Sequence, residues 1–212
     1  MVQAVLFDFD GVVVQTEELH KESFLELLPQ QVEIRDRWYY EFAGTGSGRI
    51  FRALLEEYDI DADVNELVEK RRKLFMEKVK SNKLKETPGL KDFLSFLESR
   101  GVKTAVVSGG HRSYITELLD MLGLEESFDF IISADDSSAR KPDPGPFLIA
   151  AESLGVKPGG CLVIEDSYAG CEAARKAGMK LVWVRPHESL ERPECDLEIR
   201  DFRDSRILRF FG

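Results

Sequence analysis

Short apolar runs alternate with helix-length segments over most of this 212-residue chain, and this alternation restricts its fold more than any other feature. The runs that read as strands are residues 2–7, 102–107, 130–132, 161–164 and 181–184. Helical patterns lie between them and end at glycines: Gly101, Gly123, Gly155 and Gly178. Strands that are separated by helices form a parallel sheet with helices on both faces. We therefore predict an α/β fold with a Rossmann-like parallel-sheet core.

The segment between the first two strands has a different texture. Residues 15–85 show helical periodicity and no convincing strand. In one stretch, the residues at helical spacing are apolar apart from a single arginine: Val64, Leu67, Val68, Arg71, Leu74 and Phe75. We therefore predict a catalytic α/β core made of residues 1–14 and 86–212, with a small all-helical cap, residues 15–85, inserted after the first strand.

Composition limits the partners and the compartment. Hydrophobic residues make up 43% of the chain, enough for a core with a smaller companion. The formal net charge of −10 argues against binding of nucleic acid or of an anionic membrane through the overall field. No apolar run is long enough to span a membrane. Cys161, Cys171 and Cys195 form no C-x-x-C pair, which is typical of reduced thiols in a cytoplasmic protein.

Acidic pairs stand at the ends of two predicted strands. Asp8 and Asp10 follow the first strand, and Glu165 and Asp166 follow the strand at 161–164. Either pair alone could be a solvated loop or a helix cap. In a parallel sheet, however, both pairs would border one cleft, where carboxylates roughly 4 Å apart repel by about 4 kcal/mol at an effective dielectric constant near 20. Oxygen ligands of this kind suit a hard cation, so we predict Mg²⁺ there.

Two further strand ends carry groups that can hold an anion. Ser108 follows the second strand and opens the next helix, so its hydroxyl and the amide of Gly109 would face an anion together with the helix N-terminus. Lys141 lies in a proline-bounded loop after the third strand. A serine helix cap and a solvated lysine would explain each residue separately. Together with the acid pairs, they are the groups that phosphoryl transfer by positioning and charge neutralisation requires.

At these residues the chain resembles the haloacid dehalogenase superfamily, in its branch of capped phosphatases and β-phosphoglucomutase-like phosphomutases. The matching motifs occur in order along the whole chain: Asp8-Phe-Asp10-Gly-Val, Val-Val-Ser108, Lys141-Pro, Glu165-Asp166-Ser-x-x-Gly170 and Ala173-Ala-x-x-Ala-Gly178. Thr16 and His20 match the T-E-x-x-H that leads into the cap. The acid at Asp10 separates the chain from the dehalogenase members and from the transport ATPases.

The resemblance implies a role for each motif residue. Asp8 would attack phosphorus and form an aspartyl-phosphate, and Asp10 would protonate the leaving oxygen and then activate water. The implied Mg²⁺ ligands are Asp8, the backbone carbonyl of Asp10, Asp166 and, directly or through water, Glu165. The implied phosphate-binding groups are Ser108, the amide of Gly109, and Lys141. Thr16 and His20 would support the cap and its hinge.

The chain departs from the family pattern at two places. Gln15 stands where relatives commonly have Asp, so we expect different contacts at the cap hinge. In the cap, residues 44–49 occupy the segment where sugar phosphomutases present an arginine for a second phosphate. That position is Ser47 here, although Arg49 or Arg52 could substitute, and this weakens the mutase interpretation. We expect the glycine-rich segment itself to be a flexible turn between cap helices.

We therefore predict a Mg²⁺-dependent phosphatase of a small phosphorylated metabolite, such as a sugar phosphate or a phosphoglycolate-like acid. The alternative within the family is a sugar phosphomutase. The alternative of another class is a receiver-like signalling module that carries a phospho-aspartate without turnover, against which the cap insertion and Asp10 argue. We expect a cytoplasmic monomer that binds neither nucleic acid nor membrane.

Overall fold

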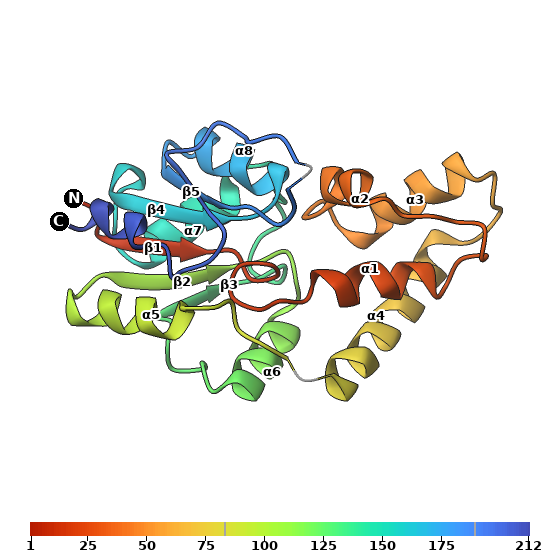
Figure 1. Ribbon diagram of the computed structural model, residues 1–212, viewed down its shortest axis with the longest axis horizontal. Helices are drawn as coiled ribbons and strands as arrows, with labels where there is room; N and C mark the ends of the chain where they lie inside the picture. The colour runs from red at the N-terminus through yellow and green to blue at the C-terminus, as the bar shows by residue number, and fades with distance from the viewer. Residues whose placement is uncertain (83, 189) are drawn as a thin grey trace.

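The computed structural model describes residues 1–82, 84–188 and 190–212; residue 83, inside the predicted cap, and residue 189 lie outside the described residues. A sheet of six parallel strands forms the centre of the larger part of the molecule (Figure 1). In order across the sheet, the strands are β3 (Phe130–Ile132), β2 (Lys103–Val107), β1 (Ala4–Phe7), β4 (Cys161–Glu165), β5 (Lys180–Val184) and β6 (Leu197–Ile199). The chain order reverses at β1, so β1, β2 and β4 end at the switch point where such sheets bind ligands.

Helices cover both faces of the sheet, which confirms the predicted α/β fold. One face carries α7 (Gly145–Ser153) and α8 (Tyr168–Lys176). The other face carries α5 (Leu90–Ser99), α6 (Arg112–Leu122) and the closing 3-10 helix η2 (Ser205–Phe210). A short 3-10 turn, η1 (Pro158–Gly160), precedes β4.

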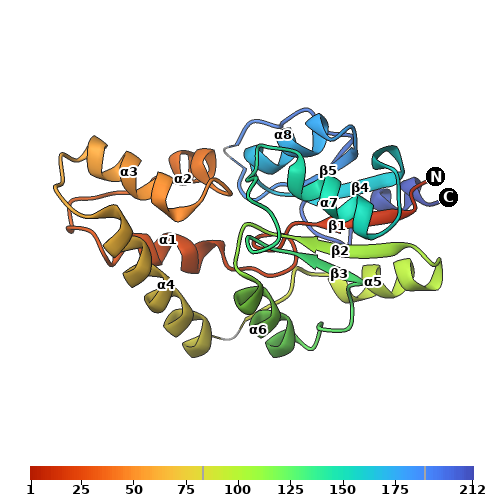
Figure 2. The same ribbon diagram turned by 180° about the vertical axis from the view of Figure 1, so that it is seen from behind.

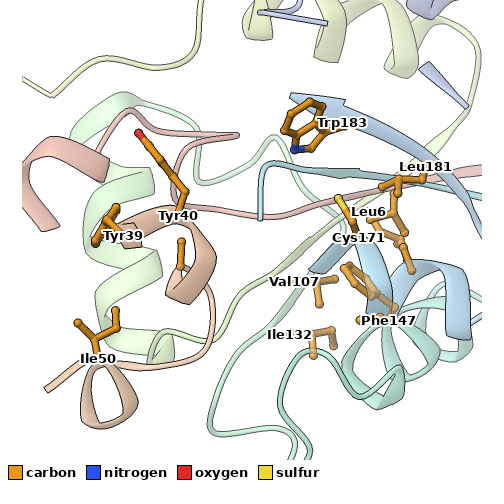
Figure 3. Close-up of a cluster of buried hydrophobic side chains, with 14 of the residues drawn as sticks. Leu6, Tyr39, Tyr40, Ile50, Val107, Ile132, Phe147, Cys171, Leu181 and Trp183 are labelled. Carbon is orange, nitrogen blue, oxygen red and sulfur yellow. The ribbon is translucent and has the colours of Figure 1, made fainter. Parts of the chain in front are cut away.

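Alternate residues of β1 enter two separate hydrophobic clusters, because successive side chains of a strand point to opposite faces. Leu6 belongs to the cluster under α7 and α8, together with Phe147 (Figure 3). Phe7 belongs to the cluster under α5 and α6, where its ring meets Phe93 and Phe128 edge-on at centroid distances of 6.2 and 5.6 Å. The strand is therefore apolar on both faces and sits at the centre of the core.

The described residues between β1 and α5 form four helices and no strand: α1 (Glu17–Leu25), α2 (Asp36–Phe42), α3 (Ser47–Glu57) and α4 (Val64–Ser81). These helices lie beyond the carboxyl ends of the strands (Figures 1 and 2). Tyr39 and Tyr40 of α2 join the same hydrophobic cluster as Trp183 of β5 (Figure 3). The helical insertion is as predicted, while its boundaries at residues 15 and 85 stay a prediction. No helix in the described part of the chain is long and apolar enough to cross a lipid bilayer.

Two connections join these helices to the sheet, and they run side by side. The amide of Gln15 donates to the carbonyl oxygen of Lys85 at 3.0 Å, and the amide of Thr87 donates to that of Val13 at 3.1 Å. The side chain of Gln15 also donates to Oγ1 of Thr87 at 2.7 Å. Gln15 therefore ties the two connections together by an uncharged hydrogen bond.

Within the α/β core, the structure differs from the sequence-based expectation at two places. β6 and η2 were not predicted. In β6 a charged Glu198 separates the two apolar residues, whereas the equally short β3 is a continuous apolar run, and the position of β6 depends on pairing with β5. The helix expected to open at Ser108 begins only at Arg112, with His111 as its N-cap residue. Residues 108–110 instead form a turn in which the amide of Gly110 donates to Oγ of Ser108 at 3.0 Å. The other predicted strands begin and end within two residues of their observed bounds.

Trp183→Phe should destabilise the folded protein. Trp183 is fully buried, and its Nε1–H donates to the carbonyl oxygen of Asp166 at 2.9 Å. The variant leaves that oxygen unpaired in the interior, so the free energy of unfolding should fall by about 1–3 kcal/mol. Urea denaturation followed by circular dichroism measures the change. Trp38→Phe, which alters a half-buried ring stacked on Phe42, is the control; an equal loss there would contradict the prediction.

Candidate active site

Three carboxylates meet at the switch point of the sheet. Asp8 directly follows β1, Glu165 is the last residue of β4, and Asp166 comes next. The amide of Asp8 donates to the carbonyl oxygen of Ile164 at 2.9 Å, so the pairing of β1 with β4 brings the two strand ends together. One oxygen from each of the three carboxylates lies within 4.8 Å of the others. The structure thus groups these three candidate ligands.

Lys141 supplies the positive charge between two of these carboxylates. Its side chain is buried and reaches the site from the loop after β3. Nζ donates to Oδ1 of Asp8, to Oε1 of Glu165 at 2.5 Å and to the carbonyl oxygen of Val107 at 3.0 Å. Burial alone would lower the pKa of this ammonium group, but the charges of Asp8 and Glu165 outweigh burial and raise it. Lys141 therefore stays protonated while it holds the ends of β1, β2 and β4 together.

A single ammonium group does not neutralise three carboxylates, two of which are buried and one partly buried. Burial, followed by the charge of Glu165, raises the pKa of Asp8 well above its usual range. Burial, followed by the charges of Glu17 and Glu165, does the same to the pKa of Asp166. A divalent cation held by Asp8, Asp166 and Glu165 would supply the missing charge, and carboxylate oxygens are ligands that Mg²⁺ prefers. The donor set fits that ion.

Two motif glycines make room for these carboxylates. A Cβ at Gly11, where φ is +77°, would overlap Oδ2 of Asp166. A Cβ at Gly170, in α8, would overlap the carboxylate of Glu165. Any larger residue at either position would push a carboxylate out of the cluster, so these glycines are needed for close approach of the backbone.

Asp10 has different partners from Asp8. Its Oδ1 accepts hydrogen bonds from the hydroxyls of Thr16 and Tyr114, both at 2.5 Å, and lies 3.1 Å from Nε2 of His20. Burial alone would raise the pKa of Asp10, but the charge of His20 and the hydrogen bonds from all three neighbours lower it. The environments of two carboxyls that are two residues apart thus move their pKa values in opposite directions.

Ser108 and Gly109 line a small pocket beside Lys141. The other residues that line it are Gly44, Ser133, Ala139, Arg140 and Pro146. Because α6 starts at Arg112, the helix N-terminus does not follow Ser108 directly, as the sequence analysis expected. The hydroxyl, the amide and the lysine remain, and such a set can hold an anion.

The cap adds a buried arginine to the site. Arg71 of α4, the one charged residue in the apolar pattern of that helix, is only 7% exposed. Its guanidinium donates to Oγ of Ser47 at 2.8 Å, lies 2.5 Å from Nδ1 of His20 and packs over the ring of Phe24 at 4.0 Å. In the sequence, the signal for this contact was the position of Arg71: a charged residue at an apolar position of the helix indicates a polar contact inside the cap. Tyr114 left no such signal, since it is 104 residues away from Asp10 in the chain.

The cap segment 44–49 is only partly a turn, which corrects the expectation of a flexible turn between cap helices. Ser47 already begins α3, and Gly44 lies against the core, where a Cβ would come 2.9 Å from Oγ of Ser167. Arg49 and Arg52 are both exposed, and the guanidinium of Arg49 lies 5.9 Å from the ring of Phe42. The buried cation of the cap therefore comes from α4 instead of from this segment.

Known proteins match the chain over nearly its full length. The family model described as haloacid dehalogenase-like hydrolase matches residues 5–184. A fructose-1-phosphate phosphatase of Escherichia coli (strain K12) is 34% identical over 186 residues, which cover 85% of this chain and 95% of that protein. A phosphorylated carbohydrates phosphatase of Thermotoga maritima is 32% identical over 187 residues, which cover 88% and 86%. The crystal structure of a β-phosphoglucomutase from Clostridium difficile superposes with a TM-score of 0.84 at 25% identity, covering 99% and 97% of the two chains.

Mg²⁺ should stabilise the protein, and more strongly at higher pH. Protons compete with the ion for Asp8 and Asp166, so the stabilisation is present above their raised pKa values and is lost as the pH falls through them. At an ion concentration about 100-fold above Kd, the gain of about 2.7 kcal/mol should raise Tm by about 5–10 °C. Thermal melts at about pH 5.5 and pH 8, with and without Mg²⁺, measure this shift.

Two variants locate the ion. Asp166→Asn should remove most of the Mg²⁺-dependent shift in Tm, because it removes one of the grouped carboxylates. Glu172→Gln, which removes an exposed carboxylate from α8, should keep the shift. An undiminished shift in Asp166→Asn would mean that Mg²⁺ binds elsewhere.

Proposed function

This chain belongs to the haloacid dehalogenase-like hydrolase family, and we propose that it is a Mg²⁺-dependent phosphatase that hydrolyses a small phosphorylated metabolite through an aspartyl-phosphate. The observation that carries this proposal is that two neighbouring carboxyl groups have different surroundings. Asp8 lies beside Lys141 and the grouped carboxylates, whereas Asp10 lies among hydrogen-bond donors. One carboxyl is therefore placed to attack phosphorus and the other to move a proton.

In the first half of the proposed reaction, the carboxylate of Asp8 attacks phosphorus. A bond forms between an oxygen of Asp8 and phosphorus while the ester P–O bond breaks, and Asp10 gives its proton to the leaving oxygen. Lys141, the hydroxyl of Ser108 and the amide of Gly109 hold the phosphoryl oxygens in place. In the second half, Asp10 takes a proton from water, which attacks phosphorus, releases phosphate and restores Asp8.

The neighbours of Asp10 suit both of its tasks. The bonds from Thr16 and Tyr114 and the contact with His20 all involve Oδ1, which fixes the orientation of the carboxyl group. The lowered pKa makes a proton on Asp10 easier to give to the leaving oxygen. The ionised form, which the lowered pKa favours, accepts a proton from water in the second half, and that proton is the one that Asp10 gives to the leaving oxygen in the next turnover.

The grouped carboxylates would hold the cation. The groups that would bind it are the side chains of Asp8, Asp166 and Glu165 and the backbone carbonyl of Asp10. When bound, Mg²⁺ supplies positive charge here, and this charge lessens the repulsion between an entering phosphate and the carboxylates. Lys141 contributes to the same balance through its contacts with Asp8 and Glu165.

We further propose a phosphorylated sugar or a similarly small phosphorylated acid as the substrate. In support, two relatives of this chain are named as phosphatases of fructose 1-phosphate and of phosphorylated carbohydrates. The cap, residues 15–85, would close over the cleft by bending at the paired connections. The cysteines are free thiols, which supports a cytoplasmic location. A monomeric state stays a prediction.

A sugar phosphomutase is the second candidate, because the fold matches that of a β-phosphoglucomutase over nearly the whole chain. A mutase must hold a sugar by two phosphate groups. At the cap position that would serve the second phosphate this chain has Ser47, and the buried Arg71 is already engaged by Ser47 and His20. These contacts favour the phosphatase. Membership in a hydrolase family also argues against the receiver-like module.

Asp8→Asn should abolish phosphate release from a generic ester such as p-nitrophenyl phosphate. An amide does not attack phosphorus, so kcat should fall by at least about 1000-fold in Mg²⁺-replete buffer. The fold should persist, which circular dichroism checks. Asp92→Asn removes an exposed carboxylate from α5 and should keep the wild-type rate. Near-wild-type activity in Asp8→Asn would rule out the mechanism.

A hexose 1-phosphate incubated with a trace of its 1,6-bisphosphate separates the two candidate functions. With Mg²⁺ present we expect free phosphate and no hexose 6-phosphate, because the cap position that would hold the second phosphate is a serine already in contact with Arg71. Phosphorus NMR measures both products in one sample. Formation of hexose 6-phosphate would assign the chain as a mutase, and a reaction mixture without Mg²⁺ is the blank.

A further inference from the structure

Two segments line the small pocket beside Lys141, and both would hold the phosphoryl oxygens in the proposed reaction. The first is the turn at residues 108–111, here called the phosphate turn, which follows β2 and contains Ser108 and Gly109. The second is the loop at residues 133–141, here called the lysine loop, which follows β3 and ends at Lys141. A phosphoryl group can meet both segments at once only while their separation is fixed.

The sheet supports the lysine loop on one side only. β3 is a three-residue strand at the edge of the sheet, where its neighbour is β2 (Figure 1). The amide of Ser108 donates to the carbonyl oxygen of Ile132 at 2.9 Å. The amide of Ala134 donates to the carbonyl oxygen of Gly110 at 2.8 Å, which extends the pairing of β2 with β3 by a short distance. Farther along the lysine loop, side chains make the connection.

Asp136 of the lysine loop binds both its own loop and α6. Its Oδ2 accepts from the amide and the hydroxyl of Ser133, at 2.8 and 2.5 Å. Nη2 of Arg112, the first residue of α6, donates to Oδ1 and Oδ2 of Asp136 at 2.8 and 2.7 Å. These bonds, foremost the one from the Ser133 hydroxyl, outweigh burial and lower the pKa of Asp136 to about 2. Asp136 is therefore ionised at neutral pH and offers Arg112 a full negative charge.

Arg112 makes two further contacts at the same edge of the sheet. Its Nη2 donates to the carbonyl oxygen of Ile131 in β3 at 2.8 Å, and its amide donates to Oδ2 of Asp135 at 2.8 Å. The side chains of Arg112 and Asp136 keep exposed fractions of 45% and 30%. Ion pairs this exposed add little to the stability of a fold. The contacts of Arg112 thus matter more for where the lysine loop lies than for the stability of the fold.

The rest of the lysine loop is closed on itself. The guanidinium of Arg140 donates to the carbonyl oxygen of Ala134 at 3.0 Å. It also donates to the carbonyl oxygens of Ser137 and Ala139. Oγ of Ser137 in turn accepts from the amide of Ala139 at 3.1 Å. Because these bonds tie the loop into one unit, a shift where it leaves β3 is passed on to Lys141 at its other end.

We propose that Arg112 and Asp136 form a positioning pair that holds the lysine loop at a fixed distance from the phosphate turn, and that the affinity of the site for phosphate depends on this pair. Neither residue is among those that line the pocket, so both act through Ser108 and Lys141. The inference rests on the proposed phosphatase function, because it concerns how the same site holds the phosphoryl group. No covalent bond changes at the pair.

Two single variants test the pair. Asp136→Asn keeps the size of the side chain and an acceptor for Ser133 but removes the charge. Arg112→Met keeps an unbranched side chain and removes the guanidinium. Each variant should raise the Kd for inorganic phosphate about 10-fold, an effect of the size of one hydrogen bond to a charged group. Isothermal titration calorimetry in Mg²⁺-replete buffer measures Kd. KM for p-nitrophenyl phosphate should rise by a similar factor, with a smaller change in kcat, because Asp8 and Asp10 are untouched.

A double variant and a control separate positioning from general damage. Because the two residues act as one unit, Arg112→Met combined with Asp136→Asn should show about the same Kd as either single variant, whereas independent effects would multiply to about 100-fold. Asp204→Asn is the matched control: it removes a partly exposed carboxylate that Arg206 contacts at 2.6 Å at the start of η2, and should keep the wild-type Kd. All variants should keep the Mg²⁺-dependent rise in Tm, because the grouped carboxylates stand at the ends of β1 and β4.

Four results would overturn the positioning pair. They are a wild-type Kd in both single variants, multiplied losses in the double variant, loss of the Mg²⁺-dependent rise in Tm together with phosphate affinity, and a loss in Arg112→Met alone, which would mean that Arg112 binds phosphate itself. A wild-type protein that binds phosphate but does not hydrolyse p-nitrophenyl phosphate, with variants that bind phosphate 10-fold more weakly, would overturn the phosphatase function and leave the pair standing. Hydrolysis by the wild type and by unchanged variants would overturn the pair alone.

Discussion

The buried ammonium group of Lys141 is the interaction on which the rest of the site depends. It contacts Asp8, Glu165 and the carbonyl oxygen of Val107, so a single group joins the carboxyl ends of β1, β4 and β2. Removing one partner from such a buried set typically costs about 3–5 kcal/mol, because the remaining charges are left uncompensated. The surplus of negative charge that persists beside Lys141 explains why the same cluster suits a divalent cation.

The cap changes what the second carboxyl of the Asp8-x-Asp10 pair can do. Two partners of Asp10, Thr16 and His20, come from the start of the cap, and His20 is in turn in contact with Arg71 of α4. The pKa of Asp10 is therefore set partly by how the cap helices pack. The cap would therefore help to set the conditions of proton transfer, over a core that provides the nucleophile.

Sequence reasoning succeeded where local pattern and topology agree. The apolar strands and their acidic ends predict a parallel sheet, and in such a sheet the ends of neighbouring strands must meet, which is why Asp8, Glu165 and Lys141 are found together. It failed for β6, where a charged Glu198 separates the only two apolar residues. It also missed Tyr114, because nothing local connects a tyrosine in α6 with an aspartate 104 residues away.

The sequence by itself determined the fold class, the helical insertion and the residue types at each strand end, because hydrophobic periodicity and chain order are local properties that burial converts directly into layers. Only the tertiary structure decided how those residues differ in chemistry. The opposite pKa shifts of Asp8 and Asp10, the burial of Arg71 and the unpaired oxygen of Glu17 each depend on distances between segments far apart in the chain. Electrostatic interactions act through such distances, and one-dimensional spacing does not contain them.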